Sequence, residues 1–403
     1  MPIRRVLRPI RELSESGKLA GLLLILATIV SLVLSNTSTS ARYLSLWDLH
    51  VGYGVLNKTV THWINDGLMA IFFFLVGLEI RREVIDGELS NPRQAMLPAL
   101  AAIGGVAAPA LIHLAFTQGQ PEASGWAIPT ATDIAFSLGI LALLGKRVPA
   151  SLRIFLTALA IIDDLLAVLI IALFYSGNLH LAYLTAAAGV FALLLLLNRL
   201  KVKPVGIYLG LGLVLWFCVL ESGIHATVAG VLLALTIPIP HIERLEHALQ
   251  RPVSYILLPI FALCNTAIVL GGGGLGAIFV SPVALGIGLG LLVGKPLGIV
   301  GVVAVLVRLG LAQLPSMVNW RQMLGLGFTA GIGFTMAIFI ATLAYQDPAV
   351  VDVSKLAVLI GSAVAATIGA TILWFTNNAA EPDAEKEETQ EAVVAASSTV
   401  VQS

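Results

Sequence analysis

Two adjacent carboxylates stand inside one of the most apolar runs of the sequence. The stretch LAIIDDLLAVLI at 159–170 carries Asp163 and Asp164. Two further ionisable residues, Asp133 and Lys295, also lie deep within apolar runs. If such runs cross a membrane, inserting each charge costs about 2.5–3.5 kcal/mol or more. Three carboxylates and one ammonium group cannot all pair, so a structural salt bridge does not account for the whole set.

These residues have the chemistry to bind small cations and protons. Neighbouring side chains on a helix diverge by about 100°, so Asp163 and Asp164 can border one cavity, one turned toward Lys295 and one toward the open site. With the hydroxyl of Thr132 they offer hard oxygen ligands, which suit Na⁺ or Li⁺. Close like charges in poorly solvated surroundings also favour protonation. The same oxygens can therefore hold either protons or a metal ion, and competition between those states is a mechanism for exchange.

The elements that must position these residues are membrane-spanning helices. Hydrophobic residues make up 58% of the chain and charged residues 11%, with a mean hydropathy of +0.95. A helix crosses the hydrocarbon core with about 20 apolar residues, and lipid leaves no backbone group unpaired. The runs are too long for barrel strands, so we expect an all-α integral membrane protein. Twelve candidate spans lie near 17–35, 60–80, 94–117, 123–144, 150–175, 181–198, 204–220, 223–238, 253–270, 283–307, 321–345 and 354–375.

The distribution of Lys and Arg orients these spans. Basic residues cluster before the first span and after even-numbered spans, whereas the opposite loops hold only Arg42, Lys58 and Lys355. Because cytoplasmic loops carry the excess of basic residues, we expect both termini to be cytoplasmic. No small-residue cleavage site clearly follows the first apolar run, so we interpret it as a retained helix.

Two spans are interrupted at matching places. The span at 123–144 contains Pro129, which removes a backbone hydrogen bond. The span at 321–345 contains Gly331 and Gly333 in its middle, a pattern that also occurs where helices merely pack tightly. Each is the central member of a triplet, spans 3–5 and spans 10–12, and the triplets start from opposite sides. This pattern favours an inverted-repeat transporter whose site lies where two broken helices cross in mid-membrane.

Asp133 and Lys295 also suit the ends of these half-helices. Broken helices place positive partial charges at their N-termini and negative ones at their C-termini, where no water screens them. A carboxylate near the positive ends and an ammonium group near the negative ends would neutralise them. A buried salt bridge to an aspartate is a second role for Lys295, and proton carriage is a third, because a desolvated lysine can release its proton.

Residues 1–378 are expected to form a single transmembrane domain. Apolar and polar residues alternate before two glycines around 44–58, which predicts a short external β-hairpin. The acidic segment 379–403 cannot bury enough apolar surface to order itself, so we expect a disordered cytoplasmic tail. Both cysteines, Cys218 and Cys264, fall within predicted helices, and no disulfide framework is indicated.

Several long segments have polar residues at positions that match the motifs of a known family. They are WINDGLMAIFFFLVGLEIRREV at 63–84, PTATDIAFSLG at 129–139, ALAIIDDLLAVLIIALFY at 158–175, SGIHATVAG at 222–230, LVGKPLGI at 292–299 and GFTAGIGFTMAIFIA at 327–341. In these motifs, and over nearly all of residues 10–378, the chain resembles the NhaA-type bacterial Na⁺/H⁺ antiporters. That family is a known example of the inverted-repeat architecture, so the resemblance and the repeat pattern are not independent arguments.

The resemblance implies roles for the charged residues. Asp163 and Asp164 would form an alternating site for a cation, Na⁺ or Li⁺, and for protons, with Thr132 close by. Asp133 and Lys295 would be a charge-compensating pair where the broken spans cross, and a bridge from Lys295 to Asp163 is a further implication.

The resemblance also implies a cytoplasmic funnel whose charged rim sets a pH response. The rim residues are Glu79, Arg82, Glu83, Glu246 and His247. Gln250 departs from the family pattern, in which a second histidine can follow His247 by three residues, and this leaves the pH set-point open. His225 is a further candidate for pH response, although a lone histidine is more often a packed, hydrogen-bonded residue.

We therefore expect a pH-regulated, electrogenic antiporter that exports Na⁺ or Li⁺ in exchange for protons by alternating access. Two carboxylates that discharge two protons to bind one monovalent cation predict two H⁺ entering per Na⁺ leaving. The resemblance places it in the bacterial inner membrane as a homodimer. No cofactor, nucleic-acid partner or enzyme activity is expected, and no P-loop signature is present.

Three other functions use similar features. A sodium-coupled symporter of an organic anion could share this architecture, but it would need donors for the organic group. An intramembrane aspartyl protease places its two aspartates on facing helices, whereas these two are adjacent on one helix. A passive channel is disfavoured because tight carboxylate sites slow the departure of ions.

Overall fold

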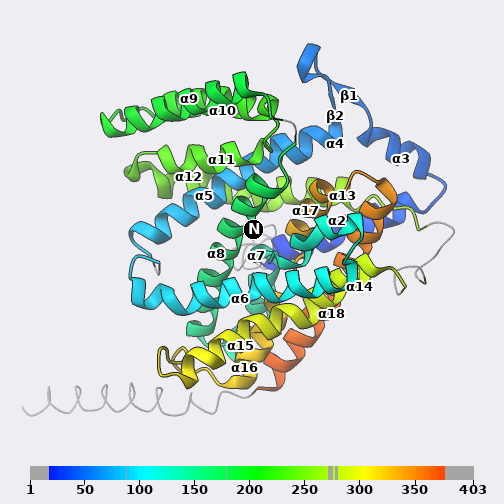
Figure 1. The fold of residues 1–403 in the computed structure, drawn as a ribbon, viewed down its shortest axis with the longest axis vertical. Helices are drawn as coiled ribbons and strands as arrows, with labels where there is room; N and C mark the ends of the chain where they lie inside the picture. Colours follow the sequence, from blue (N-terminus) through cyan, green and yellow to red (C-terminus); the bar gives the residue numbers. More distant parts are fainter. Residues whose placement is uncertain (1–17, 88, 178, 271–275, 277–279, 377–403) are drawn as a thin grey trace, which may run out of the picture.

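The protein is a bundle of helices in a computed structural model that describes residues 18–87, 89–177, 179–270, 276 and 280–376 (Figure 1). Its α-helices are α2 Lys18–Ser35, α3 Ser40–Trp47, α4 Val60–His62, α5 Met69–Ile85, α6 Pro92–Thr117, α7 Ile134–Leu144, α8 Ala150–Phe174, α9 Leu181–Arg199, α10 Val205–Ser222, α11 Thr227–Thr236, α12 Ile242–Pro252, α13 Leu258–Asn265, α14 Pro282–Leu289, α15 Lys295–Arg308, α16 Trp320–Ala330, α17 Phe334–Ala344 and α18 Pro348–Phe375. Shorter 3-10 and π-helical segments are η1 Gly54–Leu56, η2 Trp63–Leu68, η3 Pro121–Thr130, η4 Gly145–Arg147, η5 Ile239–His241, η6 Val253–Leu257 and η8 Gly290–Gly294. The expected tail at 379–403 lies outside the described residues.

The expected all-α membrane architecture is confirmed in its main features. Within the described ranges, eight helical segments are long and apolar enough to cross a bilayer, judged by length and composition. They are Val60–Ile85, Pro92–Thr117, Pro121–Leu144, Ala150–Phe174, Leu181–Arg199, Val205–Ser222, Pro282–Arg308 and Pro348–Phe375. Counting each of three bent helix pairs as one span raises the number to eleven.

This count of spans is one short of the expected twelve, because the predicted spans 223–238 and 253–270 belong to one bent helix pair. Thr227–Thr236 and Ile239–Asn265 meet across a short break at an angle of 117°. Helix α11 has 10 residues, or about 15 Å at 1.5 Å per residue. That is about half the thickness of the hydrocarbon core, so α11 is too short to cross alone.

Two helices are interrupted where the sequence predicts it. On one, the 3-10 segment η3 contains Pro129, and the chain is extended before α7 begins at Ile134. On the other, α16 and α17 are separated by Gly331–Gly333 and differ in direction by 43°. Pro129 cannot donate a backbone hydrogen bond, which accounts for the first break. The largest cluster of buried apolar side chains surrounds both breaks.

Close helix packing holds the layer that carries Lys295. Helices α14 and α15 follow each other in one segment, joined by η8, and this segment lies beside α6 in Figure 1 with extensive contacts. At the closest approach of α6 and α15, a Cβ atom on Gly104 would collide with the carbonyl oxygen of Gly298, and a Cβ on Gly298 with the carbonyl oxygen of Gly104. Glycine at both positions is therefore what lets the two backbones touch.

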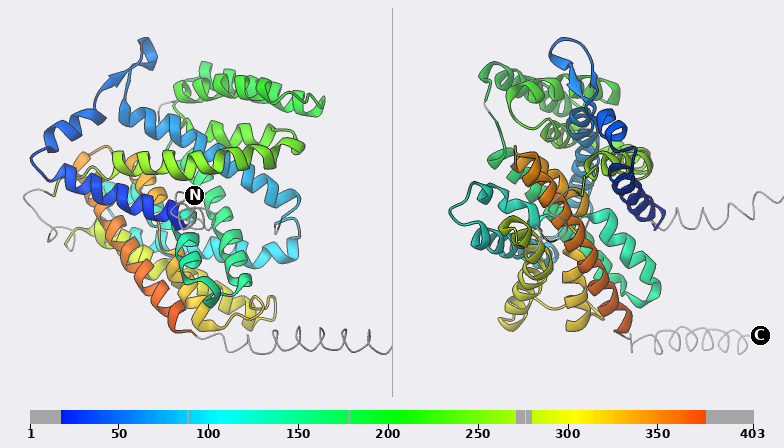
Figure 2. Two further views of the ribbon diagram at one scale, coloured as in Figure 1. Left: turned by 180° about the vertical axis from the view of Figure 1, so that it is seen from behind. Right: turned by 90° about the vertical axis from the view of Figure 1, so that its right-hand side faces the viewer.

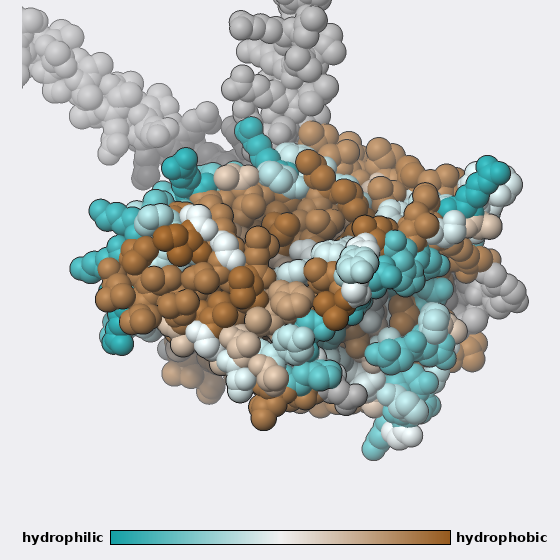
Figure 3. All heavy atoms as spheres, turned by 90° about the horizontal axis from the view of Figure 1, so that it is seen from above, coloured by the Kyte–Doolittle hydropathy of each residue, from teal (hydrophilic) through white to brown (hydrophobic). Residues whose placement is uncertain are grey.

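Helices α9 and α10 form a peripheral pair. They lie against each other at one end of the molecule, away from α15 and α16, in Figures 1 and 2. Only 11% of the most apolar window of α9 is buried inside the protein, against 67% for α8. Figure 3 shows broad areas of apolar residues bordered by hydrophilic ones, as a surface facing lipid requires.

A short β-hairpin follows α3. Strand β1 His50–Val51 pairs antiparallel with β2 Lys58–Thr59, with His50 opposite Thr59. The predicted start at residue 44 is wrong, because the chain is helical through Trp47. Tyr43 packs edge-on against Trp47 one helical turn later, with ring centroids 5.6 Å apart, and its hydroxyl donates to the carbonyl of Leu263 at 2.8 Å. The contact between Tyr43 and Trp47 on one helix face, together with docking on α13, favours helix over the strand that the alternating pattern predicts.

The contact between α6 and α15 gives a stability prediction. Gly104→Ala should lower the midpoint of thermal unfolding in detergent, because relieving the collision costs about 1–3 kcal/mol. Gly301→Ala, on the same helix as Gly298, is the matched control, because an added Cβ there meets no atom within 4 Å. The control should keep or slightly raise the midpoint, since alanine favours helix. Equal midpoints for the two variants would contradict this account of the packing.

Candidate functional site

Main-chain and hydroxyl groups join the two helix breaks directly. The amide of Asp133 donates to the carbonyl of Ile332 at 2.7 Å. The hydroxyl of Thr132 lies 2.8 Å from the carbonyl oxygen of Ala330, and that of Ser137 donates to the carbonyl of Thr329 at 3.0 Å. Thr329 and Ala330 are the last residues of α16, and Ile332 lies in the break that follows it. The segment around the first break thus supplies donors to carbonyls at and beyond the end of α16.

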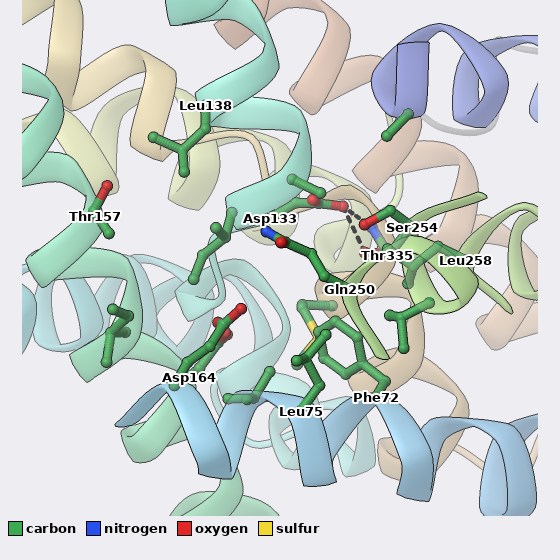
Figure 4. A pocket seen from close by; sticks show the side chains of 18 of the residues that line it. Phe72, Leu75, Asp133, Leu138, Thr157, Asp164, Gln250, Ser254, Leu258 and Thr335 are labelled. Atoms are coloured by element: carbon green, nitrogen blue, oxygen red, sulfur yellow. Dashed lines mark hydrogen bonds between the residues drawn. The ribbon is translucent and has the colours of Figure 1, made fainter. Parts of the chain in front are cut away.

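Asp133 caps two helices at once. Its Oδ1 accepts the amide of Phe136 at 3.0 Å, at the start of α7. Its Oδ2 accepts both the amide of Thr335, at 3.1 Å, and the hydroxyl of the same residue, at the start of α17. Figure 4 shows this contact as dashed lines. A buried carboxylate thus meets two helix N-termini, whose partial positive charges stabilise it.

Asp163, Thr132 and Lys295 form a closed polar cluster beside the crossing. The Nζ of Lys295 forms a short ion pair with Oδ2 of Asp163. The hydroxyl of Thr132 lies 2.6 Å from the same oxygen. Thr132 and Lys295 are fully buried, and Asp163 is nearly so. Oδ1 of Asp163 has no hydrogen-bond donor within the described part of the chain. Lys295 is thus bonded to Asp163 rather than to Asp133.

Asp164 faces a different space from its neighbour. It lines a cavity of about 380 Å³ together with Asp133, Thr335 and Glu79. In Figure 4 its carboxylate points into the space enclosed by α5, α7 and α8. Because the two side chains diverge on α8, one carboxylate is neutralised by an ammonium group while the other borders the cavity.

The lining of this cavity continues to a group of charged residues on α5 and α12. Arg82 donates through Nε to Glu246 at 2.9 Å and through Nη1 to Glu83 at 2.7 Å. Glu79, Arg82 and Glu246 line the cavity, and so does Gln250. His247 is exposed and is not among the lining residues. The structure therefore gathers four of the five predicted rim residues into one network and leaves His247 outside it.

His225 lies apart from this cavity. Its Nε2 is 2.8 Å from the carbonyl oxygen of Tyr175, which follows α8. The contact is the packed, hydrogen-bonded environment that is usual for a lone histidine. Among the described residues, His225 makes no hydrogen bond to the charged network on α5 and α12.

The three predicted cation ligands do not surround one open space. Thr132 and Asp163 are bonded to each other and to Lys295, whereas Asp164 faces the cavity. In the described ranges, no group of three or more His, Cys, Asp or Glu residues is spaced to hold a metal ion. A cation held by both aspartates would have to reach Asp163 either at its unpaired Oδ1 or at Oδ2 after the bond to Lys295 opens.

Thr335 is not among the site residues predicted from the sequence. This residue gives Asp133 two of its hydrogen bonds and lines the cavity. A signal for it exists, since Thr335 follows Gly333 at the start of a half-helix, as Asp133 follows Pro129 in the other. Gly333 itself allows close approach, because a Cβ there would lie 3.1 Å from the carbonyl oxygen of Ala131.

The fold and site define a polytopic helical membrane protein with buried carboxylates at a crossing of two broken helices. The sequence model of the family described as "Na+/H+ antiporter 1" matches residues 11–373. The chain is 47% identical to the Na(+)/H(+) antiporter NhaA of Cytophaga hutchinsonii over 94% of its length and 97% of the relative. It is 48% identical to the NhaA of Mesorhizobium japonicum over the same shares. The chain belongs to this family of Na⁺/H⁺ antiporters, a family of transporters rather than enzymes.

The ion pair of Asp163 and Lys295 gives a prediction that separates pairing from packing. Lys295→Met should destabilise the protein by about 3–5 kcal/mol, because it leaves a buried carboxylate without its partner. The double variant Asp163→Asn/Lys295→Met should recover most of that loss, since neither charge remains. Chemical unfolding in detergent would measure both. Additive losses in the double variant would show that the two residues do not interact.

Proposed function

We propose that the protein is a pH-regulated, electrogenic antiporter that exports Na⁺ or Li⁺ in exchange for H⁺. Family membership and the printed names of the relatives support Na⁺/H⁺ exchange. The single observation that carries the mechanism is the placement of Asp164 on the cavity beside a buried ion pair of Asp163 and Lys295. Bound protons, Na⁺ and Li⁺ are all substrates here, and no cofactor takes part.

The proposed cycle exchanges one cation for two protons. In the proton-loaded state, Asp164 is protonated and the pair of Asp163 and Lys295 holds one further transferable proton. A cation entering the cavity displaces the proton of Asp164, and Asp163 turns from Lys295 to the cation as the pair releases its proton. Both carboxylates then bind one positive charge. The unpaired Oδ1 of Asp163 supports this step, because it is an acceptor already without a donor in the described residues.

Access to this site would alternate between the two sides of the membrane. We propose that spans 3–5 and 10–12 are inverted repeats, which the matching breaks before α7 and α17 support. The excess of basic residues in one set of loops supports cytoplasmic termini and a cytoplasmic opening of the cavity. The inner membrane is the proposed location. The hairpin of β1 and β2 protrudes from the body in Figure 2 and supports a homodimer formed through it.

The proposed pH response resides in the charged network on α5 and α12. Glu79, Arg82 and Glu246 line the same cavity as Asp164, and Arg82 also binds Glu83. A change in protonation among these groups would alter the potential at the cavity and the contact between α5 and α12. His247 is exposed outside this network, and His225 contacts the carbonyl of Tyr175, so neither would act on the cavity directly.

Exchange can be tested with inverted membrane vesicles that carry a respiration-driven proton gradient. Adding NaCl should collapse the gradient, followed with a fluorescent ΔpH probe between pH 6.5 and 8.5, in vesicles with the wild-type protein. Asp164→Asn should reduce the response to that of vesicles without the protein, because it removes the exchangeable charge. Glu243→Gln, on an exposed position of α12, is the matched control and should retain activity. No collapse by the wild type at any pH would contradict antiport and favour the sodium-coupled symporter.

Electrogenic exchange can be tested separately in proteoliposomes. At a fixed ΔpH, an inside-negative potential set with K⁺ and valinomycin should accelerate Na⁺ efflux, because two protons entering for one Na⁺ leaving carry net positive charge inward. Protein-free liposomes give the leak. A rate independent of the potential would refute the two-to-one exchange while leaving Na⁺/H⁺ antiport intact.

A further inference from the structure

We propose that a groove between α5, α10 and α11 binds one phospholipid molecule, with its acyl chain in the groove and its phosphate at Lys58. The proposal is independent of the ion exchanged. It rests on an apolar groove, a polar notch that continues from it, and the residues that the two have in common.

The groove is a preformed apolar space on the outside of the bundle. It has a volume of about 450 Å³, within the usual range for a small-molecule site. Its floor contains the buried side chains of Phe74 and Leu233, and its edges contain Ile71 and Leu213, which are 42% and 69% exposed. It lies along helices that are apolar enough to span a bilayer, so hydrocarbon is what surrounds it.

The few polar groups of the groove already have partners. The indole Nε1 of Trp63 donates to the carbonyl of Val51 at 2.9 Å, and that of Trp216 donates to the carbonyl of Asp66 at 2.9 Å. All other lining residues are aliphatic, phenylalanine or glycine. The side chains of the groove therefore offer no hydrogen bond to an occupant. A polar ligand would need such hydrogen bonds, whereas an acyl chain does not.

A polar notch continues from one end of the groove. Trp63, Gly67 and Trp216 line both spaces, and the notch adds Lys58 and His62. The two indole rings are stacked, with centroids 6.0 Å apart, at the end tied to the hairpin. Tryptophan pairs of this kind are typical of the depth at which lipid headgroups begin.

The notch contains both the ammonium group of Lys58 and the carboxylate of Asp66, together with the imidazole of His62. The carboxylate of Asp66 is bonded to Nε2 of His62 at 3.1 Å, so it is engaged within the protein. Lys58, on β2 just before α4, is half-buried and lines the notch with its ammonium group. A phosphate at Lys58 with an acyl chain below the two tryptophans matches both ends of one lipid molecule.

Gly210 provides a way to fill the groove without disturbing the bundle. It lines the groove on α10, and a Cβ added there meets no atom within 4 Å. A leucine at this position would therefore occupy the space of the acyl chain. Gly206 lies one turn earlier on the same helix, is equally unobstructed, and is not among the lining residues, which makes Gly206→Leu a matched control.

The experiment measures binding of dioleoyl phosphatidylglycerol to the delipidated full-length protein in detergent, by native mass spectrometry. The wild type and Gly206→Leu should bind one molecule per chain with the same affinity. Gly210→Leu should bind at least tenfold more weakly, because the leucine and the acyl chain compete for one volume. Lys58→Gln should bind about fivefold more weakly, because it removes the ammonium group that would pair with the phosphate, and Lys58→Arg should restore binding. Dioleoylglycerol should bind the wild type as weakly as the phospholipid binds Lys58→Gln, and glycerol phosphate should not bind.

Three results would overturn the proposal. Equal lipid binding by wild type and Gly210→Leu would place the acyl chain elsewhere. Equal binding by wild type and Lys58→Gln would remove the headgroup contact. Loss of a dimer in Gly210→Leu, without any lipid bound to the wild type, would make the groove an interface between two copies of the chain. Thermal unfolding midpoints, compared across the variants, would show that each remains folded.

Discussion

Helix ends in an apolar interior must find partners for their free amides and carbonyls within the protein, because hydrocarbon supplies none. The structure meets this constraint by bringing two breaks together. Asp133 accepts from the starts of α7 and α17, and its own amide donates to Ile332 at the end of the facing break. Thr132 at this crossing is also bonded to Asp163, which pairs with Lys295, so the crossing is tied to α8 and through it to α15.

Adjacent residues on one helix can have opposite surroundings, and the site depends on this. Asp163 is turned to Lys295 in a region that excludes solvent, whereas Asp164 borders the cavity. Two carboxylates facing one ammonium group would leave neither available for a second positive charge. Because the two side chains diverge, Asp163 is neutralised by Lys295 while Asp164 stays open to ions. One helix thus supplies both carboxylates.

The crossing and its charges could be predicted from the sequence because they depend on local chemistry. A charge in an apolar run is conspicuous at Asp163 or Lys295, and Pro129 and the pair Gly331 and Gly333 mark possible breaks in two long apolar runs, although α6 continues through Pro98 and Pro109. Tertiary contacts could not be predicted in the same way. Tyr43 docks on α13 within a helix that continues through Trp47, where alternation predicts a hairpin from about residue 44. Thr335 is one of many threonines until the fold brings it to Asp133. The partner of Lys295 depends on the packing of α6 against α15, and the sequence alone left three roles open for it.

The double cap of Asp133 also has a mechanical consequence. A single carboxylate bonded to both α7 and α17, reinforced by the main-chain bond to Ile332, makes the two half-helices one rigid body. Any motion that separated them would expose two helix ends to hydrocarbon, so their relative position is the most resistant to change. Across the cavity, α5 and α12 face the crossing through lining residues such as Phe72, Leu75 and Gln250. A displacement of α5 and α12 relative to α7 and α17 would therefore leave the crossing intact as one block.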